Sequence, residues 1–207
     1  MKIGSTRKDY KIKKKIIIKD NNPILTFDYW YKKASKTVSE PNAFCLSTIS
    51  GNNAESRMML LKDYGNKFTF FTNIKSRKGS QILKTKKCSM NFWWKEIHQQ
   101  VRISGNISKL QNKLTMDYFY SRPKESQIAA LISNQSRVIK SYDILIKRYK
   151  NFIKEYKNKE VPFPSNWVGF EINPLKFEFW QGGEFRLHQR VEFIKVGKKW
   201  KKNLLAP

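Results

Sequence analysis

The sequence is poor in acidic residues, in cysteine and in long apolar runs, and each shortage excludes a class of protein. Of its 207 residues 16 are Asp or Glu, whereas nine are Arg and 33 are Lys, giving a formal net charge of +26. Cys45 and Cys88 are too few for a disulfide framework and match no metal-binding pattern, so we expect two buried, reduced thiols. No apolar run approaches the roughly 18 residues of a membrane span, and residues 16–18 are too short for a signal-peptide core. These shortages predict a cytoplasmic protein.

The excess of positive charge raises the possibility of a nucleic-acid-binding protein, so its distribution matters. Residues 1–50, 51–100 and 101–150 each carry a net charge of +7, and residues 151–207 carry +5. A nucleic-acid footprint gathers in one segment or on one face, whereas this even spread of mainly Lys resembles a compositional bias over an ordinary surface. Nucleic-acid binding therefore stays an alternative, which predicts a colourless protein whose DNA affinity falls steeply with salt.

Aromatic residues are abundant and exclude a disordered chain. The sequence holds six Trp, nine Tyr and 14 Phe, which can bury enough surface to offset the entropy lost on ordering. The length suits one domain. We expect a basic, mobile N-terminal segment over residues 1–22 and a single domain over residues 23–207.

Apolar periodicity and turn residues predict many short strands with inserted helices. Helices are expected at 23–36, 76–85, 114–120, 126–133 and in an amphipathic run that continues to about residue 156. Strands are expected at 43–50, 57–62, 67–73, 88–94, 99–110, 167–172, 176–181, 191–196 and 200–205, and an interruption of 99–110 is expected at residues 105–106. Such a pattern favours a mainly β, α+β fold, an antiparallel barrel with α-helical decoration.

Two neighbouring segments have the composition of a phosphate site. Thr72 ends a strand, and Ser76, Arg77 and Lys78 then open a helix, which combines free backbone N–H groups, a positive dipole end and two cations. The strand-like segment 57–62 carries a cation at each end, although an odd spacing places the two on opposite faces of a strand. Plain surface charge explains either segment equally well.

A second candidate anion site lies at a helix break. Tyr118 and Arg122 are four residues apart and share one helical face. Pro123 then breaks the helix and lets Ser126 turn back toward the same place. A phenol, a guanidinium and a hydroxyl that converge would suit a phosphate. A capped helix–helix junction is an equally good interpretation.

A third cluster is the alternating run of Arg186, His188 and Arg190. In an extended chain these side chains share one face, and they would repel one another unless an anion lay opposite. The other histidine, His98, lies in a polar run and is expected at the surface.

Taken together, these segments resemble those of the pyridoxamine (pyridoxine) 5'-phosphate oxidase family, over about residues 7–207. The resemblance rests on six motifs in the family's order and spacing: RMMLLK (57–62), FFTNIKSRKG (70–79), QQVRISG (99–105), YFYSRPKESQIAALISNQS (118–136), FWQGGEFRLHQR (179–190) and LLAP (204–207). It implies an FMN-binding split β-barrel that forms a homodimer, with two FMN sites at the subunit interface.

The resemblance also implies which residues hold FMN. One subunit would contribute strand 57–62 beside the flavin ring, and residues around the phosphate and ribityl chain: Arg57, Met58, Leu60, Leu61, Lys62, Phe71, Thr72, Arg77 and Lys78. The other subunit would contribute Gln100, Gln135, Ser136, Trp180 and Arg190. The odd spacing of Arg57 and Lys62 is then no obstacle, because the strand backbone itself would run along the flavin.

The substrate site follows from the same resemblance. Its phosphate would be held by Lys62, Tyr118, Arg122 and Ser126. Arg186 and His188 would cover the pyridine ring as the catalytic pair, with His188 orienting the substrate as readily as acting as a base. Arg7 and Tyr10 have the family's spacing for a lid over the bound substrate.

The reaction implied is oxidation of pyridoxamine 5'-phosphate or pyridoxine 5'-phosphate to pyridoxal 5'-phosphate. A hydride would pass from C4' to flavin N5, and O2 would be reduced to hydrogen peroxide, with cations such as Arg190 suited to charge near flavin N1. A flavin reductase on the same fold is the nearer alternative, but it has no use for a second phosphate site.

Three residues depart from the family's pattern. Gln189 stands where an acidic residue is expected, Arg137 where a smaller polar residue is usual, and Leu204 where Arg is expected. None is assigned to the substrate, but Leu204 could weaken packing on the FMN side or between subunits.

Overall fold

Nine strands form one antiparallel sheet in the computed structural model, which describes Tyr10 and residues 15–207. The strands are β1 (Ala43–Ser50), β2 (Asn53–Leu60), β3 (Asp63–Tyr64), β4 (Phe68–Asn73), β5 (Lys87–Trp94), β6 (Gln99–Lys109), β7 (Trp167–Gln181), β8 (Gln189–Val196) and β9 (Lys199–Leu205). They pair in the order β2-β1-β5-β6-β7-β4-β3. In addition, β8 pairs with residues 176–181 of β7, and β9 pairs with β8. The sheet therefore stays open, and β7 joins its two parts.

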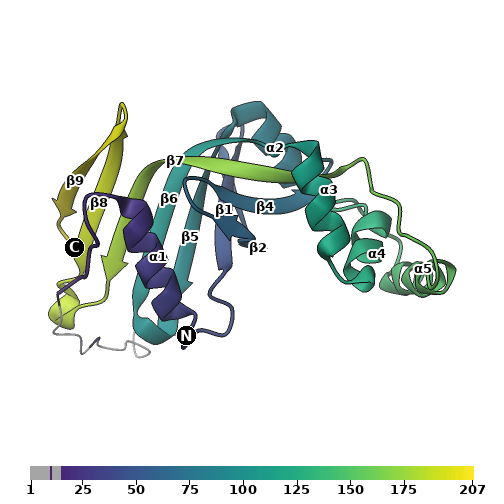
Figure 1. Ribbon diagram of the computed structural model, residues 1–207, viewed down its shortest axis with the longest axis horizontal. Coiled ribbons are helices and arrows are strands. Elements are labelled where there is room, and N and C mark those ends of the chain that lie inside the picture. The colour runs from purple at the N-terminus through teal and green to yellow at the C-terminus, as the bar shows by residue number, and fades with distance from the viewer. Residues whose placement is uncertain (1–9, 11–14) are drawn as a thin grey trace.

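Five α-helices and two short 3-10 helices complete the described chain. They are α1 (Pro23–Ala34), α2 (Arg77–Thr85), α3 (Asn112–Ser121), α4 (Lys124–Ile132) and α5 (Tyr142–Glu155), with η2 (Lys95–Ile97) and η3 (Glu184–Arg186). Figure 1 shows α1 against the curved sheet, α3 to α5 at one end of the molecule, and β8 and β9 at the other. No described helix is both long and apolar enough to cross a membrane.

The hydrophobic core has two parts, one between the sheet and α1 and one at the end that carries α3 to α5. The larger lies between α1 and the sheet, where Phe27 and Trp30 of α1 are fully buried and the Phe27 ring contacts those of Phe68 and Phe92. The smaller lies beneath α3 and α4 and is centred on Phe119 and Trp167. The helical end is thus attached to the sheet through its own apolar cluster.

Most expected elements are confirmed, and polar side chains cap the first turns of α1 and α2. The side chain of Asn22 accepts a hydrogen bond from the backbone N–H of Ile24 at 3.0 Å. Ser76 caps α2 by accepting from the N–H of Gly79 at 3.3 Å. These bonds satisfy N–H groups that a helix leaves free in its first turn.

Three strand predictions were wrong in detail. The predicted strands 167–172 and 176–181 are one strand, β7, because Pro174 lies at an irregularity opposite Gly105, where proline is tolerated. A Cβ on Gly105 would lie 2.2 Å from the carbonyl oxygen of Asn173, so the glycine permits this close approach. The expected interruption of 99–110 is therefore a bulge within continuous β6. The expected strand 57–62 is β2, which ends at Leu60.

The two cysteines differ more than expected. Cys88 is buried, and burial raises its pKa to about 12, so the thiol stays protonated. Cys45 on β1 is only half-buried. The expectation of two buried thiols therefore holds for Cys88 alone.

Candidate functional site

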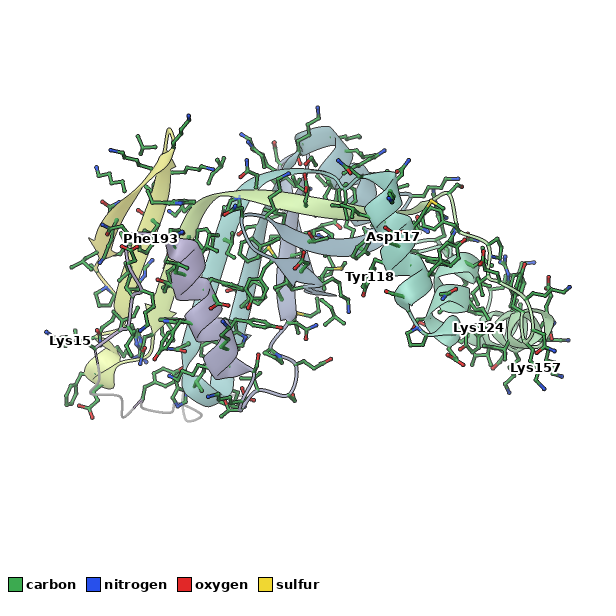
Figure 2. All side chains as sticks on the ribbon, in the orientation of Figure 1. Lys15, Asp117, Tyr118, Lys124, Lys157 and Phe193 are labelled. Atoms are coloured by element: carbon green, nitrogen blue, oxygen red, sulfur yellow. The ribbon has the colours of Figure 1, made fainter. Side chains whose placement is uncertain are left out.

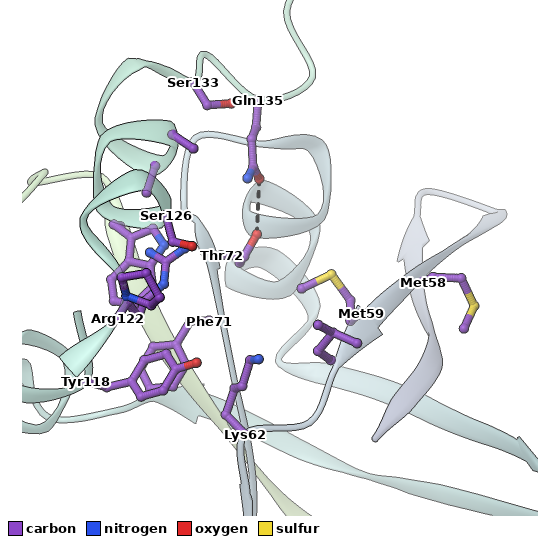
Figure 3. Close-up of a pocket in the computed structure, with 15 residues that line it drawn as sticks. Met58, Met59, Lys62, Phe71, Thr72, Tyr118, Arg122, Ser126, Ser133 and Gln135 are labelled. Atoms are coloured by element: carbon purple, nitrogen blue, oxygen red, sulfur yellow. Dashed lines mark hydrogen bonds between the residues drawn. The ribbon is translucent and has the colours of Figure 1, made fainter. Parts of the chain in front are cut away.

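A pocket of about 630 Å³ lies where β2 and β4 face α3 and α4. It is lined by Met58, Met59, Leu60, Lys62, Phe71, Thr72, Tyr118, Arg122, Pro123, Ser126, Ala129, Ala130, Ser133, Gln135 and Trp167. Figure 3 shows Tyr118, Arg122 and Ser126 along one wall, with Lys62 reaching in from below and Met59 opposite. None of these lining residues is acidic, so the pocket favours an anion.

Stacked rings fix the wall that carries Tyr118. Its ring lies 4.1 Å from that of Phe71, centroid to centroid, at an interplanar angle of 15°. Phe71 in turn stacks on Trp167 at 5.0 Å and 8°. Trp167 is buried at the start of β7. The phenol is therefore held by rings from two strands, which orders its hydroxyl at little further entropic cost.

Arg122 is a cation of the pocket with a buried donor that no described residue satisfies. Its guanidinium lies over the Trp167 ring, 5.0 Å from the centroid. Its Nη1 atom is buried and has no hydrogen-bond partner among the described residues. Burial lowers the pKa of Arg122, and Tyr118 opposes that shift. A buried donor without an acceptor is costly, so the site is built to receive an acceptor from outside the chain.

The predicted substrate-phosphate set is thus brought together. Lys62, Tyr118, Arg122 and Ser126 line one pocket although they come from the β2–β3 connection, α3 and α4. Lys62 lies beyond the end of β2, and its N–H donates to the carbonyl of Thr69 at 2.9 Å. The odd spacing of residues 57 and 62 therefore does not place Lys62 on the opposite face from Arg57, because Lys62 is not part of β2.

Part of the predicted FMN set adjoins the same pocket. The ammonium of Lys78 lies 3.2 Å from the hydroxyl of Thr72 and 3.3 Å from the side-chain oxygen of Gln135. Thr72 also donates to that oxygen at 3.3 Å (Figure 3). The N–H of Arg77 donates to the hydroxyl of Ser136 at 3.3 Å. Burial, followed by the nearby charge of Arg57, lowers the pKa of Lys78.

Arg57 is anchored by residues that the sequence reasoning missed. Its guanidinium donates to the Thr48 hydroxyl at 2.5 Å and to the side-chain oxygen of Gln81 at 3.3 Å, and both partners are buried. Glu55 lies 3.4 Å away. Burial lowers the pKa of Arg57, an effect that Glu55 opposes. No local sequence signal marks Thr48 or Gln81, because each meets Arg57 only through strand and helix packing.

Gln135 and Ser136 lie beside the first predicted FMN set within a single chain. They were assigned to the second subunit's set, yet in one chain they contact Thr72, Lys78 and Arg77 of the first set. The turn after α4 brings them there, with Ser136 in the left-handed region at φ 65°. One chain therefore brings them into contact with Thr72, Arg77 and Lys78.

The remaining predicted residues gather near the other end of β7. The rings of Trp180 and His188 lie 4.7 Å apart, and Tyr10 contacts them at 5.9 and 5.8 Å. Gln100 donates to the side chain of Asn91 at 2.7 Å. Arg7 lies outside the described residues.

The cations at this end do not share one extended face. Phe185 and Arg186 have left-handed φ angles of 53° and 62°, and β8 begins only at Gln189. Arg186 is exposed, whereas Nε and Nη2 of Arg190 contact Glu178 at 2.9 Å. The anion opposite Arg190 is therefore a carboxylate of this chain. Burial and then the charge of Arg186 lower the pKa of His188.

The structure also shows where His98 and the three residues that depart from the family's pattern lie. His98 was expected at the surface but is half-buried, with its ring 4.6 Å from that of Tyr10. The side chain of Gln189 accepts from the N–H of Ile16 at 2.8 Å. Arg137 is exposed, and Leu204 keeps 80% of its surface exposed.

The two groups of residues lie at opposite ends of a single chain. Figure 2 places Tyr118 at the helical end and Phe193 of β8 at the other. Figure 1 shows the length of the sheet between them. One chain therefore brings together the Arg122 pocket and the Lys78 group, but not the Trp180–His188 group.

Comparison with known proteins agrees with this geometry. The family model described as pyridoxamine 5'-phosphate oxidase matches residues 31–153, and one described as the pyridoxine 5'-phosphate oxidase C-terminal dimerisation region matches residues 167–207. A pyridoxine/pyridoxamine 5'-phosphate oxidase of Aliarcobacter butzleri is 43% identical over 91% of each chain. One from Trichormus variabilis is 39% identical over 99% of this chain and 98% of its own.

Solved structures show the same fold. PhzG of Burkholderia lata, in complex with tetrahydrophenazine-1-carboxylic acid, superposes with a TM-score of 0.85 at 26% identity, over 90% of this chain and 93% of its own. A pyridoxamine 5'-phosphate oxidase-related, FMN-binding protein of Nostoc punctiforme gives 0.74 at 10% identity, over 91% and 99%. The fold is thus the expected split β-barrel type, with an open sheet. The chain belongs to the pyridoxamine 5'-phosphate oxidase family.

Proposed function

We propose that this chain forms a homodimer that binds FMN and oxidises pyridoxamine 5'-phosphate and pyridoxine 5'-phosphate to pyridoxal 5'-phosphate. O2 would be the final acceptor, yielding hydrogen peroxide, and the amine would also consume water and release ammonia. The observation that carries the proposal is the buried Nη1 of Arg122, which no described residue partners, in a pocket shared with Lys62, Tyr118 and Ser126. A phosphate supplies the acceptor that this guanidinium lacks.

The residues beside this pocket fit the phosphate end of FMN. Arg57 and Lys78 are two neighbouring cations with pKa values lowered by burial, a situation that a dianion would relieve. Thr72, Gln135 and Ser136 add hydroxyl and amide groups next to them. FMN, when bound, supplies the two-electron acceptor of the reaction. Arg57, Thr72, Arg77, Lys78, Gln135 and Ser136 would hold it.

The rest of the site would come from the second chain. Trp180 lies at the end of β7 opposite to Trp167, which lines the Arg122 pocket, and it pairs there with Gln100 of β6 and Arg190 of β8. His188 and Tyr10 contact Trp180, so this group would serve the pocket of another chain. The match of residues 167–207 to a dimerisation region supports their meeting a partner's pocket. Arg186 and His188 would then cover the pyridine ring, and exposed Arg186 is free to reach it.

The chain's own contribution is binding and orientation. Lys62, Arg122, Tyr118 and Ser126 would fix the substrate through its phosphate, which places C4' reproducibly without an acid–base group in contact with it. The lowered pKa of His188 keeps its imidazole neutral near pH 7, so it would orient the ring by hydrogen bonding rather than add charge.

The test is reduction of the bound flavin in the absence of oxygen. The purified protein should be yellow, and pyridoxine 5'-phosphate should bleach the oxidised flavin band, whereas unphosphorylated pyridoxine at the same concentration should not. Bleaching by NADH alone would identify a flavin reductase instead. A colourless protein whose affinity for DNA falls steeply with salt would support the nucleic-acid alternative.

A further inference from the structure

The junction between α3 and α4 sets the distance between two residues of the Arg122 pocket. Arg122 follows the last residue of α3 and has an extended backbone, φ −79° and ψ 152°. Pro123 comes next and has no N–H to donate, so helical hydrogen bonding does not cross the break. Ser126 already belongs to α4. The N–H groups of Ser126 and Gln127 donate to the carbonyl of Pro123, so the hydrogen-bond ladder of α4 ends one residue short of Arg122 and leaves room for side chains to fix its position relative to Ser126.

Gln127 supplies one such link. Its side chain is buried, with 8% of its surface exposed, and its Nε2 group donates to the carbonyl of Arg122 at 2.8 Å and to that of Tyr120 at 3.3 Å. These are carbonyls at the end of α3, which lack helical partners. Gln127 therefore links the backbone of Arg122 to α4 by a direct hydrogen bond.

Lys124 supplies a second link, on the outer side of the junction. Its ammonium donates to the carbonyls of Tyr156, Lys157 and Lys159 at 2.9, 3.0 and 3.1 Å. Figure 2 shows Lys124 next to the end of α5, beside Lys157. All three donors of the ammonium are used at the negative end of a helix dipole, so the first turn of α4 is tied to α5.

We propose that Gln127 and Lys124 are positioning residues that set the geometry of the phosphate site through Arg122 and Ser126. Neither side chain lines the pocket. The inference rests on the proposed function for the identity of the ligand. It predicts that their loss weakens recognition of phosphate and leaves turnover at saturating substrate intact.

Gln127→Met removes both donors while keeping the side chain's length. KM for pyridoxine 5'-phosphate should rise on the order of 10-fold, below the roughly 100-fold that a 1 Å misplacement can cost. The limiting rate kcat and the FMN content should stay at wild-type levels. Thr26→Val is the matched control, because the hydroxyl of this buried residue also makes two hydrogen bonds, both with the backbone of Lys19, far from the pocket. It should lower thermal stability without changing KM.

Lys124 allows a rescue experiment. Lys124→Met loses all three contacts and should raise KM several-fold, whereas Lys124→Arg keeps the positive charge and donors for some of the same carbonyls and should restore part of the wild-type KM. If both variants have the same KM, the ammonium's contacts do not position the site.

A binding measurement separates failure of this inference from failure of the proposed function. Calorimetry with inorganic phosphate should show weaker binding to Gln127→Met than to wild type. If wild type binds phosphate but does not oxidise pyridoxine 5'-phosphate, the proposed function is wrong and the phosphate affinities alone decide the positioning role. If wild type oxidises it and Gln127→Met has an unchanged KM, the positioning role is wrong. If wild type does neither, both are overturned.

Discussion

The two ends of the chain treat their cations in opposite ways. At the helical end, Arg122 lies in a pocket whose lining holds no carboxylate, and one of its buried nitrogens has no partner in the described chain. At the β8–β9 end, Arg102 and Arg190 both contact Glu178, and Lys176 contacts Glu192. Both carboxylates are nearly buried. The nitrogen of Arg122 that no described residue partners indicates a ligand site, whereas the ion pairs at the β8–β9 end stabilise the fold whether or not Arg190 also contacts a ligand.

This contrast limits what net charge can reveal. The chain carries +26 in an even spread, so neither sequence nor total charge distinguishes the two ends. Only the arrangement of the few acidic residues does. Substitutions at the two ends should therefore have different consequences, on binding at one and on stability at the other.

The largest effect is expected for Arg122→Ala. It removes a charge-assisted contact worth roughly 1.5–3 kcal/mol, so KM for pyridoxine 5'-phosphate should rise about 10- to 100-fold while FMN stays bound. Steady-state kinetics measure KM, and the flavin absorbance of the purified variant measures how much FMN stays bound. Loss of FMN with unchanged substrate affinity would mean that the two phosphate sites have been assigned the wrong way round.

Lys78→Met should affect the other anion. The ammonium lies beside Thr72 and Gln135, so its loss should weaken FMN binding roughly 10-fold and leave KM nearly unchanged once FMN is saturating. Quenching of flavin fluorescence during titration of the FMN-free protein measures the affinity. Lys84→Met is the control, because this lysine also belongs to α2 but lies near its end. Equal affinities for the two variants would refute the assignment.

Glu178→Gln tests the structural end of the comparison. It leaves Arg102 and Arg190 without their shared counter-charge, and the free energy of unfolding should fall by about 1–2 kcal/mol, because both guanidinium groups are partly exposed. Denaturant unfolding measures the change. Substrate KM should move less than in Arg122→Ala, and the opposite ranking would erase the distinction between the two ends.

The smallest effect is a pH dependence at β8. The hydrogen bond from Lys176 lowers the pKa of Glu192 below its usual 4.5, with a further contribution from Asn203 and opposition from burial. Because the folded-state pKa is the lower one, the stabilisation is complete above pH 4.5 and is lost as pH falls through the folded value. Thermal unfolding between pH 6 and pH 3 should show this loss in wild type and a shallower slope in Glu192→Gln.

Much of the fold could be predicted from sequence because its signals are local. Asn22 and Ser76 cap the helices at the expected starts, and β1 has the expected bounds. The sequence places an irregularity at residues 105–106, but it does not show that β6 continues through it as a bulge, because the bulge depends on the close approach of Asn173 from a distant strand.

The site was predictable to the extent that its residues form local motifs. Tyr118, Arg122 and Ser126 are close in sequence, and the pocket brings them together with Lys62. Thr48 and Gln81 were missed because they reach Arg57 only through tertiary packing. The contacts of Gln135 and Ser136 with Thr72, Lys78 and Arg77 also depend on three-dimensional distance, so sequence spacing alone does not reveal them.

The central claim is that each site combines the Arg122 pocket of one chain with Arg186 and His188 of another, and hybrid dimers test it most directly. Arg122→Ala and Arg186→Ala should each be nearly inactive at low substrate concentration. Co-expressed with different affinity tags, they form a hybrid with one intact site and one doubly altered site, which should recover about half of the wild-type activity. A hybrid no more active than either parent would show that both residues act within the same chain, contradicting the account.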